Sequence, residues 1–167
     1  MKVAVLMGSD SDLPRLEPCL ETLRGLEIEF VARVLSAHRT PAALVRFVEQ
    51  EAPAQDVRVF ICAAGGAAHL AGVVAAHTDL PVLGIPMDNP PLGGLDALLA
   101  TVQMPGGVPV ATLGTGGGGP VNAALHAARI LALVDEGIAA RVAGYRAKQA
   151  ETVAAKDARL QEKLRGG

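Results

Sequence analysis

Aromatic side chains are scarce in this sequence: 167 residues include three Phe, one Tyr and no Trp. So few rings provide no platform on which nucleic-acid bases could stack. The charge is also nearly balanced, because 15 basic and 17 acidic residues leave a formal net charge of −2. Neither nucleic acid nor an anionic membrane surface is therefore an expected partner. Half of the residues are hydrophobic, which excludes an intrinsically disordered chain.

Cysteine and long apolar runs are equally rare. Cys19 and Cys62 form neither a disulfide framework nor a metal-binding spacing, and the four histidines lie in different predicted elements. No apolar run approaches the roughly 20 residues that span a bilayer, and the run at residues 2–7 is too short for a signal peptide core. We expect a cytoplasmic protein of a reducing compartment, without a bound metal.

Short β-branched runs alternate with Ala/Leu-rich segments along most of the chain. Strands are predicted at about 2–7, 28–35, 57–63, 81–85 and 109–113, and helices at about 12–25, 41–52, 67–77, 93–101 and 120–136. The strands are almost continuously apolar, as in a parallel sheet covered on both faces. This pattern predicts an α/β fold, a three-layer αβα sandwich around a flavodoxin-like, parallel five-stranded sheet. A barrel of eight such units would need roughly 250 residues.

The C-terminal segment differs from the rest. Residues 138–164 are highly charged, carry apolar residues at helical spacing and precede no further strand. We predict an extra C-terminal helix, which could pack on its own domain or on a neighbouring subunit. The whole chain, 1–167, is expected to be one domain with a core at about 1–136.

Ligands of an open α/β sheet bind at the carboxyl ends of its strands, so the loops after the strands are the candidate sites. The first loop contains Gly8, Ser9, Ser11 and Asp12. It could simply begin a helix, or it could bind an anion through backbone N–H groups and serine hydroxyls. Because carboxylates repel phosphate, at least one aspartate is expected to accept hydrogen bonds from sugar hydroxyls. A phosphate next to a ribose would satisfy both requirements.

Two further loops carry candidate residues. At the end of a strand predicted to be buried, His38 offers an imidazole that could act as a general acid or base, and Arg39 offers a planar cation suited to phosphate. In the third loop, the paired glycines Gly65 and Gly66 would let the backbone approach a ligand, and alanines such as Ala64 would form a small apolar wall. His69 stands in the first turn of the next predicted helix. That loop could equally be a structural turn. The other two histidines, His77 and His126, are expected to be packing or surface residues.

The run Gly114–Gly119 matches the G-x-G-x-x-G pattern of dinucleotide-binding loops. In that fingerprint a strand with an acidic residue follows the helix, and here no strand follows. We therefore predict a flexible lid or a close-approach loop in place of a nicotinamide site.

Several blocks of the sequence, taken in order, resemble the N5-carboxyaminoimidazole ribonucleotide mutases of bacterial purine biosynthesis. The resemblance covers about residues 3–135 and rests on Met7–Asp12, Ser36–Pro41, Gly65–Leu70, Pro81–Pro86 and Gln103–Pro105. It implies an isomerase, a ribonucleotide substrate, no organic cofactor and no metal, and a homo-octamer. It also implies His38 as the general acid/base. The implied substrate-binding residues are Gly8, Ser9, Ser11, Asp12, Ser36, Arg39, Ala64, Gly65, His69 and Leu70.

Two other readings of the sequence remain open. One is a carboxylase that adds free CO₂ to aminoimidazole ribonucleotide. The other is a non-catalytic flavodoxin-like domain that binds a ligand or partner, because this fold supports many functions.

Overall fold

The computed structural model describes residues 1–166, and within that range five parallel strands form one sheet in the order β2-β1-β3-β4-β5. The strands are β1 (Lys2–Met7), β2 (Glu29–Val34), β3 (Val57–Ala64), β4 (Val82–Pro86) and β5 (Ala111–Thr112). This order confirms the predicted flavodoxin-like sheet. Because β1 and β3 lie at its centre, their side chains are covered on both faces.

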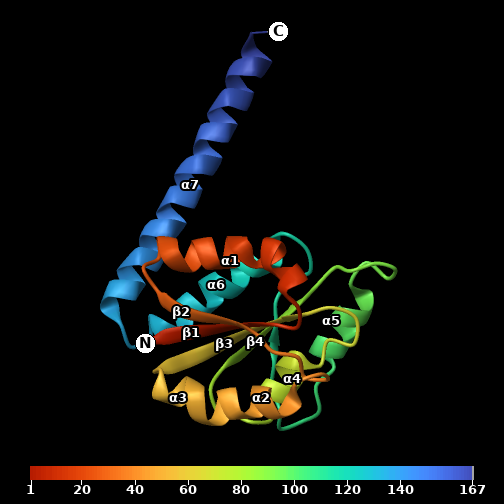
Figure 1. The fold of residues 1–167 in the computed structure, drawn as a ribbon. Coiled ribbons are helices and arrows are strands. Elements are labelled where there is room, and N and C mark those ends of the chain that lie inside the picture. Colours follow the sequence, from red (N-terminus) through yellow and green to blue (C-terminus); the bar gives the residue numbers. More distant parts are fainter. Residues whose placement is uncertain (167) are drawn as a thin grey trace.

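Helices cover both faces of this sheet, which confirms the predicted three-layer sandwich (Figure 1). The helices are α1 (Leu13–Gly25), α2 (Pro41–Arg46), α3 (Ala52–Ala54), α4 (Leu70–Ala75), α5 (Leu95–Val102), α6 (Gly118–Leu131) and α7 (Glu136–Arg165). A 3₁₀ turn, η1 (Asp10–Asp12), precedes α1, and a π-helical turn, η2 (Phe47–Glu51), joins α2 to α3. Helices α1 and α6 lie on one face, and α2, α3 and α4 on the other.

The alternation of side chains along β1 builds a separate core on each face. Val3 and Val5 are fully buried against α1 and α6, whereas Ala4 and Leu6 are fully buried on the α2 and α4 side. Helix α6 presents buried alanines to its neighbours, so its backbone lies close to both α1 and the sheet. The four are Ala123, Ala124, Ala127 and Ala128.

Several predicted boundaries were wrong. The predicted strand at 109–113 is only two residues long, since Pro109 lacks the N–H group that a sheet ladder needs. The predicted helix at 67–77 covers only Leu70–Ala75, because Ala68 N–H donates to the Gly66 carbonyl in a tight turn. The helix at 41–52 is interrupted by η2. Strand β2 is an edge strand with exposed residues, although it was predicted to be buried.

The C-terminal helix α7 packs on its own domain at its start and then projects away from it (Figure 1). Asp135 caps it by accepting a hydrogen bond from the Ile138 N–H at 2.9 Å. Val142 and Tyr145 pack against the α1/α6 core, and Arg141 Nε donates to the Leu26 carbonyl at 2.6 Å. Residues 146–166 are all exposed. Within residues 1–166, no helix combines the length and apolarity that crossing a membrane would require.

We predict that enlarging one buried alanine of α6 destabilises the fold. Ala127 has no exposed surface, so Ala127→Leu must displace α1 or the sheet and should lower the free energy of unfolding by about 1–3 kcal/mol. The control His126→Ala replaces an exposed neighbour on the same helix and should change the free energy of unfolding by less than about 0.5 kcal/mol. Thermal unfolding followed by circular dichroism measures both, and equal midpoints for the two variants would contradict this packing.

Candidate functional site

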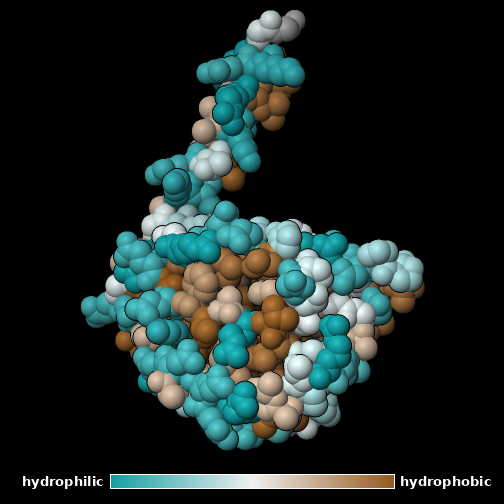
Figure 2. Space-filling view, in the orientation of Figure 1, coloured by the Kyte–Doolittle hydropathy of each residue, from teal (hydrophilic) through white to brown (hydrophobic). Residues whose placement is uncertain are grey.

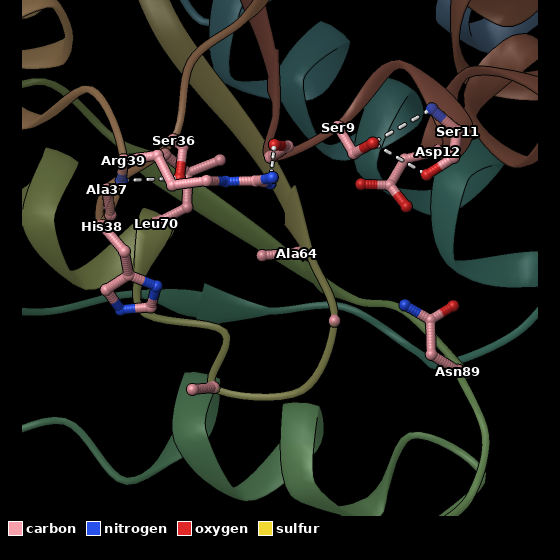
Figure 3. Close-up of a pocket in the computed structure, with 13 residues that line it drawn as sticks. Ser9, Ser11, Asp12, Ser36, Ala37, His38, Arg39, Ala64, Leu70 and Asn89 are labelled. Atoms are coloured by element: carbon pink, nitrogen blue, oxygen red, sulfur yellow. Dashed lines mark hydrogen bonds between the residues drawn. The ribbon is translucent and has the colours of Figure 1, made fainter.

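A cleft of about 220 Å³ opens at the carboxyl edge of the sheet (Figure 3). The loops that follow β1, β2, β3 and β4 meet there, so residues far apart in the sequence become neighbours. Its lining consists of Gly8, Ser9, Ser11, Asp12, Ser36, Ala37, His38, Arg39, Ala64, Gly65, Ala67, Leu70 and Asn89. The cleft spans the point between β1 and β3 where the strand order reverses, which is the usual ligand position in this topology.

The loop after β1 combines serine hydroxyls with a buried carboxyl group. Ser9 begins the 3₁₀ turn, and its Oγ accepts a hydrogen bond from the Ser11 N–H at 3.3 Å and one from the Ser11 hydroxyl at 2.9 Å. Asp12 is only 7% exposed. Burial raises the pKa of its carboxyl group, although the Ser9 backbone contact and the Arg15 charge oppose this shift. The loop therefore has hydroxyl groups on one side and a desolvated carboxyl group on the other.

The loop after β2 is fixed by its own hydrogen bonds. Thr40 Oγ1 accepts from the Ser36 N–H at 3.0 Å, and the Arg39 N–H donates to Ser36 Oγ at 3.1 Å. The Arg39 guanidinium reaches across to the first loop, where Nη2 donates to the Gly8 carbonyl at 3.2 Å. A single cation thus lies beside the serines of two loops, an arrangement suited to binding phosphate.

His38 and His69 contact each other through their rings. The distance from His38 Nε2 to His69 Nδ1 is 2.8 Å, and the rings meet edge to face with centroids 4.9 Å apart. Because one of these nitrogens must donate and the other accept, the contact holds a single proton between the rings. Figure 3 shows the other His38 nitrogen, Nδ1, on the side of the ring that faces Ala64. That nitrogen is left to meet a ligand in the cleft.

The floor of the cleft is made of small residues. Ala64 ends β3 and Gly65 follows it, and a Cβ atom on Gly65 would collide with the amide nitrogen of Asn89. Asn89 belongs to the loop after β4, and its Oδ1 accepts a hydrogen bond from Arg15 Nη1. Glycine is therefore required at position 65 for the Asn89 amide to lie against the cleft floor.

Most of the predicted site residues come together in this cleft. Gly8, Ser9, Ser11, Asp12, Ser36, His38, Arg39, Ala64, Gly65 and Leu70 all line it, whereas His69 contacts His38 but is not part of the lining. The Gly114–Gly119 run is not part of the lining. It is a close-approach loop at Gly119, where a Cβ atom would collide with the Gly114 carbonyl oxygen.

Three lining residues were not predicted. Ala37 and Ala67 lie inside the two predicted loops, but an alanine carries no chemical signal of its own. Asn89 follows the predicted strand at 81–85, and a polar residue just after a strand end is the signal that could have identified it. The two remaining histidines are exposed, and His77 Nδ1 lies 2.8 Å from Glu49 Oε1.

Among the residues that the structure describes, the lining of the cleft includes no cysteine and no cluster of metal ligands. Across residues 1–166, no three His, Cys, Asp or Glu side chains are grouped so that they could hold a metal ion. Both cysteines are buried, and burial raises the pKa of the Cys19 thiol to about 12 and raises that of Cys62 as well. Neither thiol has the lowered pKa of a reactive cysteine.

Comparison with known proteins gives one consistent family. The model of the AIR carboxylase family matches residues 2–152. The N5-carboxyaminoimidazole ribonucleotide mutase of Brucella melitensis is 52% identical over 152 residues, which cover 91% of this chain and 93% of that protein. The mutase of Bacillus subtilis is 44% identical over 151 residues, with 90% and 93% covered.

A solved structure shares the fold over nearly its whole length. The crystal structure of Treponema denticola PurE superposes with a TM-score of 0.86 at 30% identity, and the match covers 95% of this chain and 97% of that one. The shared fold therefore extends over nearly the whole of both chains.

The buried carboxyl group of Asp12 should make stability depend on pH. Since burial raises its pKa in the folded state, ionisation opposes folding, and stability should fall as the pH rises through the titration range of this group. Asp12→Asn should remove this fall and melt higher than the natural protein at neutral pH. Melting temperatures measured from about pH 3 to about pH 7 test this. The control Asp10→Asn removes an exposed carboxyl group of the same loop. If both variants changed the melting temperature by the same amount, the role of burial would be contradicted.

Proposed function

The chain belongs to the AIR carboxylase family, and from that membership we propose that it is an isomerase of purine biosynthesis. It converts N5-carboxyaminoimidazole ribonucleotide to 4-carboxy-5-aminoimidazole ribonucleotide. One observation carries this proposal: a single cleft holds a cation beside serine hydroxyls, a buried carboxyl group and a histidine. These groups complement the phosphate, the ribose and the reacting base of such a substrate. A binding domain without catalytic activity would not need a histidine paired in this way.

The substrate lies with its phosphate at Arg39 and its sugar at Asp12. The Arg39 guanidinium and the hydroxyls of Ser9, Ser11 and Ser36 supply donors to the phosphate oxygens. The Asp12 carboxylate accepts hydrogen bonds from ribose hydroxyls, and the phosphate stays away from it because like charges repel. The base then extends over Ala64 and Gly65 toward His38.

His38 is the group that moves the proton. Its cationic ring donates a proton to the exocyclic nitrogen as the N–C bond of the carbamate breaks, which releases CO₂ and leaves aminoimidazole ribonucleotide. Ring carbon C4 then attacks CO₂ and forms the new C–C bond. Neutral His38 takes the proton from C4, so the proton given in the first step returns in the last. General acid–base assistance of this kind contributes about 10²–10⁴ in rate.

His69 holds the ring of His38 in place for this transfer. Because Nε2 of His38 is engaged with Nδ1 of His69, Nδ1 of His38 remains for the substrate. A proton held on Nε2 by this contact leaves Nδ1 of neutral His38 as the base. We therefore assign His69 a positioning role, which fits its contact with His38 and its absence from the cleft lining.

The small floor of the cleft keeps CO₂ close to the ring carbon. Ala64, Gly65 and Ala67 have no polar side chains that would capture a released CO₂. Holding two reactants at contact distance is worth at most about 7–11 kcal/mol of the barrier. No outside carboxyl donor and no organic cofactor are needed for this sequence of steps.

We also propose that the chain assembles with copies of itself, as the homo-octamer that the resemblance implies. Figure 2 shows hydrophobic residues gathered on the body of the domain and along one side of the projecting helix. Large exposed apolar patches of this kind mark protein–protein interfaces. The exposed apolar residues include Val34 on the edge strand, Leu92 before α5, Leu95, Leu99 and Val102 on α5, Leu133 and Val134 after α6, and Val153, Leu160 and Leu164 on α7.

The family name itself favours a second candidate, direct carboxylation of aminoimidazole ribonucleotide by free CO₂. The two reactions differ in their substrate and in their need for bicarbonate. We expect the protein to convert the N5-carboxy compound to the 4-carboxy product in buffer without added bicarbonate. We also expect aminoimidazole ribonucleotide to react only slowly under the same conditions. A rate that depends on bicarbonate and requires aminoimidazole ribonucleotide would favour the carboxylase instead.

Replacing His38 should separate catalysis from binding. His38→Asn removes the proton donor and acceptor and should lower kcat about 10²–10⁴-fold in both directions, with a smaller change in the dissociation constant. Arg39→Ala is the matched variant, because it should raise KM and the dissociation constant for the ribonucleotide far more than it lowers kcat. Steady-state assays measure kcat and KM, and titration calorimetry measures the dissociation constant. Normal turnover by His38→Asn would remove this residue from the mechanism.

A further inference from the structure

Asn89 enters the cleft from the loop after β4, and its amide has a fixed direction. Its Oδ1 accepts from Arg15 Nη1. An arginine side chain has only donors, so the oxygen must face Arg15 and the nitrogen must face the other way. The nitrogen lies against Gly65 on the cleft floor, and Figure 3 shows it directed toward the cavity. The two N–H donors of Asn89 are therefore presented to the space where a ligand would bind.

Arg15 binds this amide and also acts electrostatically on the carboxyl group of Asp12. The two residues are three positions apart at the start of α1, a spacing that places side chains on one face of a helix. Arg15 lies near enough to Asp12 to influence the titration of its carboxyl group, and its Nη1 also lies 3.4 Å from Asp88 Oδ1. Figure 3 shows Asp12 and Asn89 on the side of the cleft away from His38. An acceptor and a donor thus face the same part of the cavity.

We propose that Asn89 is a sugar-binding residue: its Nδ2 donates a hydrogen bond to a ribose hydroxyl whose own hydrogen is accepted by Asp12. Arg15 is a positioning residue that sets the direction of the amide. The inference rests on the proposed function, since it assumes a ribonucleotide in the cleft. A hydroxyl is the ligand group that fits, because it donates and accepts at once. A substrate carboxylate at the same place would be repelled by Asp12.

The decisive measurement compares ligands with and without a sugar hydroxyl. Calorimetric titrations use the 4-carboxy ribonucleotide product and its 2′-deoxy and 3′-deoxy counterparts as probes. We expect the natural protein to bind at least one deoxy compound about tenfold more weakly than the ribonucleotide, because a buried donor and acceptor lose their partner.

Asn89→Asp is the main variant. It keeps an oxygen for Arg15 but removes the N–H donors, so it should bind the ribonucleotide more weakly and reduce the ribose-to-deoxyribose affinity ratio several-fold. The added negative charge weakens all three probes alike, so it does not change this ratio. Asn89→Ala should reduce the ratio in the same way, and its melting temperature shows whether the loop remains folded.

Two variants test the role of Arg15 through the same ratio. Arg15→Met frees the amide to rotate and should reduce the ratio, whereas Arg15→Lys supplies another donor and should restore part of it. Asp88→Asn is the matched control, because it removes the neighbouring ion pair without touching the amide and should leave the ratio unchanged.

The possible outcomes separate this inference from the proposed function. If the natural protein converts and binds the ribonucleotide, but Asn89→Asp has the same affinity ratio as the natural protein, the sugar contact is overturned and the isomerase is not. If the natural protein neither binds nor converts it, the proposed function fails and the inference fails with it. A reduced ratio in both Asn89 variants, with Asp88→Asn unchanged, supports the contact.

Discussion

The parallel order of the sheet is the constraint on which the cleft depends. In the order β2-β1-β3-β4-β5 every strand points the same way, so the loops after β1, β2, β3 and β4 all emerge at one edge. Helices leave β1 and β3 toward opposite faces, and the loops separate at that point and create a cavity. No loop could make the site alone, since Ser9, Ser11 and Asp12 come from the loop after β1. Ser36, His38 and Arg39 come from the loop after β2, and Asn89 comes from the loop after β4.

Charges of both signs share this cavity, and their separation makes it selective. Arg39 reaches over Gly8 on one side, and Asp12 is buried on the other. A ligand with one anionic end and a hydroxylated middle satisfies both, whereas an anion that filled the cleft would meet the carboxylate. The buried carboxyl group also opposes folding, because desolvation disfavours its charged form. The fold thus maintains at Asp12 a group that stability alone would not retain, which fits the ribose contact proposed for it.

Small residues determine how closely the parts approach. Alanines of α6 allow its backbone to lie against both α1 and the sheet, and Gly65 allows the Asn89 amide to lie on the cleft floor. Prediction from the sequence recognised Gly65 as a position of close approach, but it could not identify the partner. Asn89 is 24 residues away along the chain, and only the parallel pairing of β3 with β4 brings the two together. The same limit applies to Arg15, whose partner is 74 residues away.

Periodicity and composition were enough to determine the class of fold, the parallel sheet and the loops that carry His38, Arg39, Ser9 and Asp12. These features are local, because each apolar run and each group of turn residues occupies a few consecutive positions. The lengths of β5 and α4, the edge position of β2, the contact of His69 with His38 and the direction of the Asn89 amide were decided only in the tertiary structure. Each of these depends on contacts between segments distant in sequence, and the free energy of such contacts does not exist until the chain has folded.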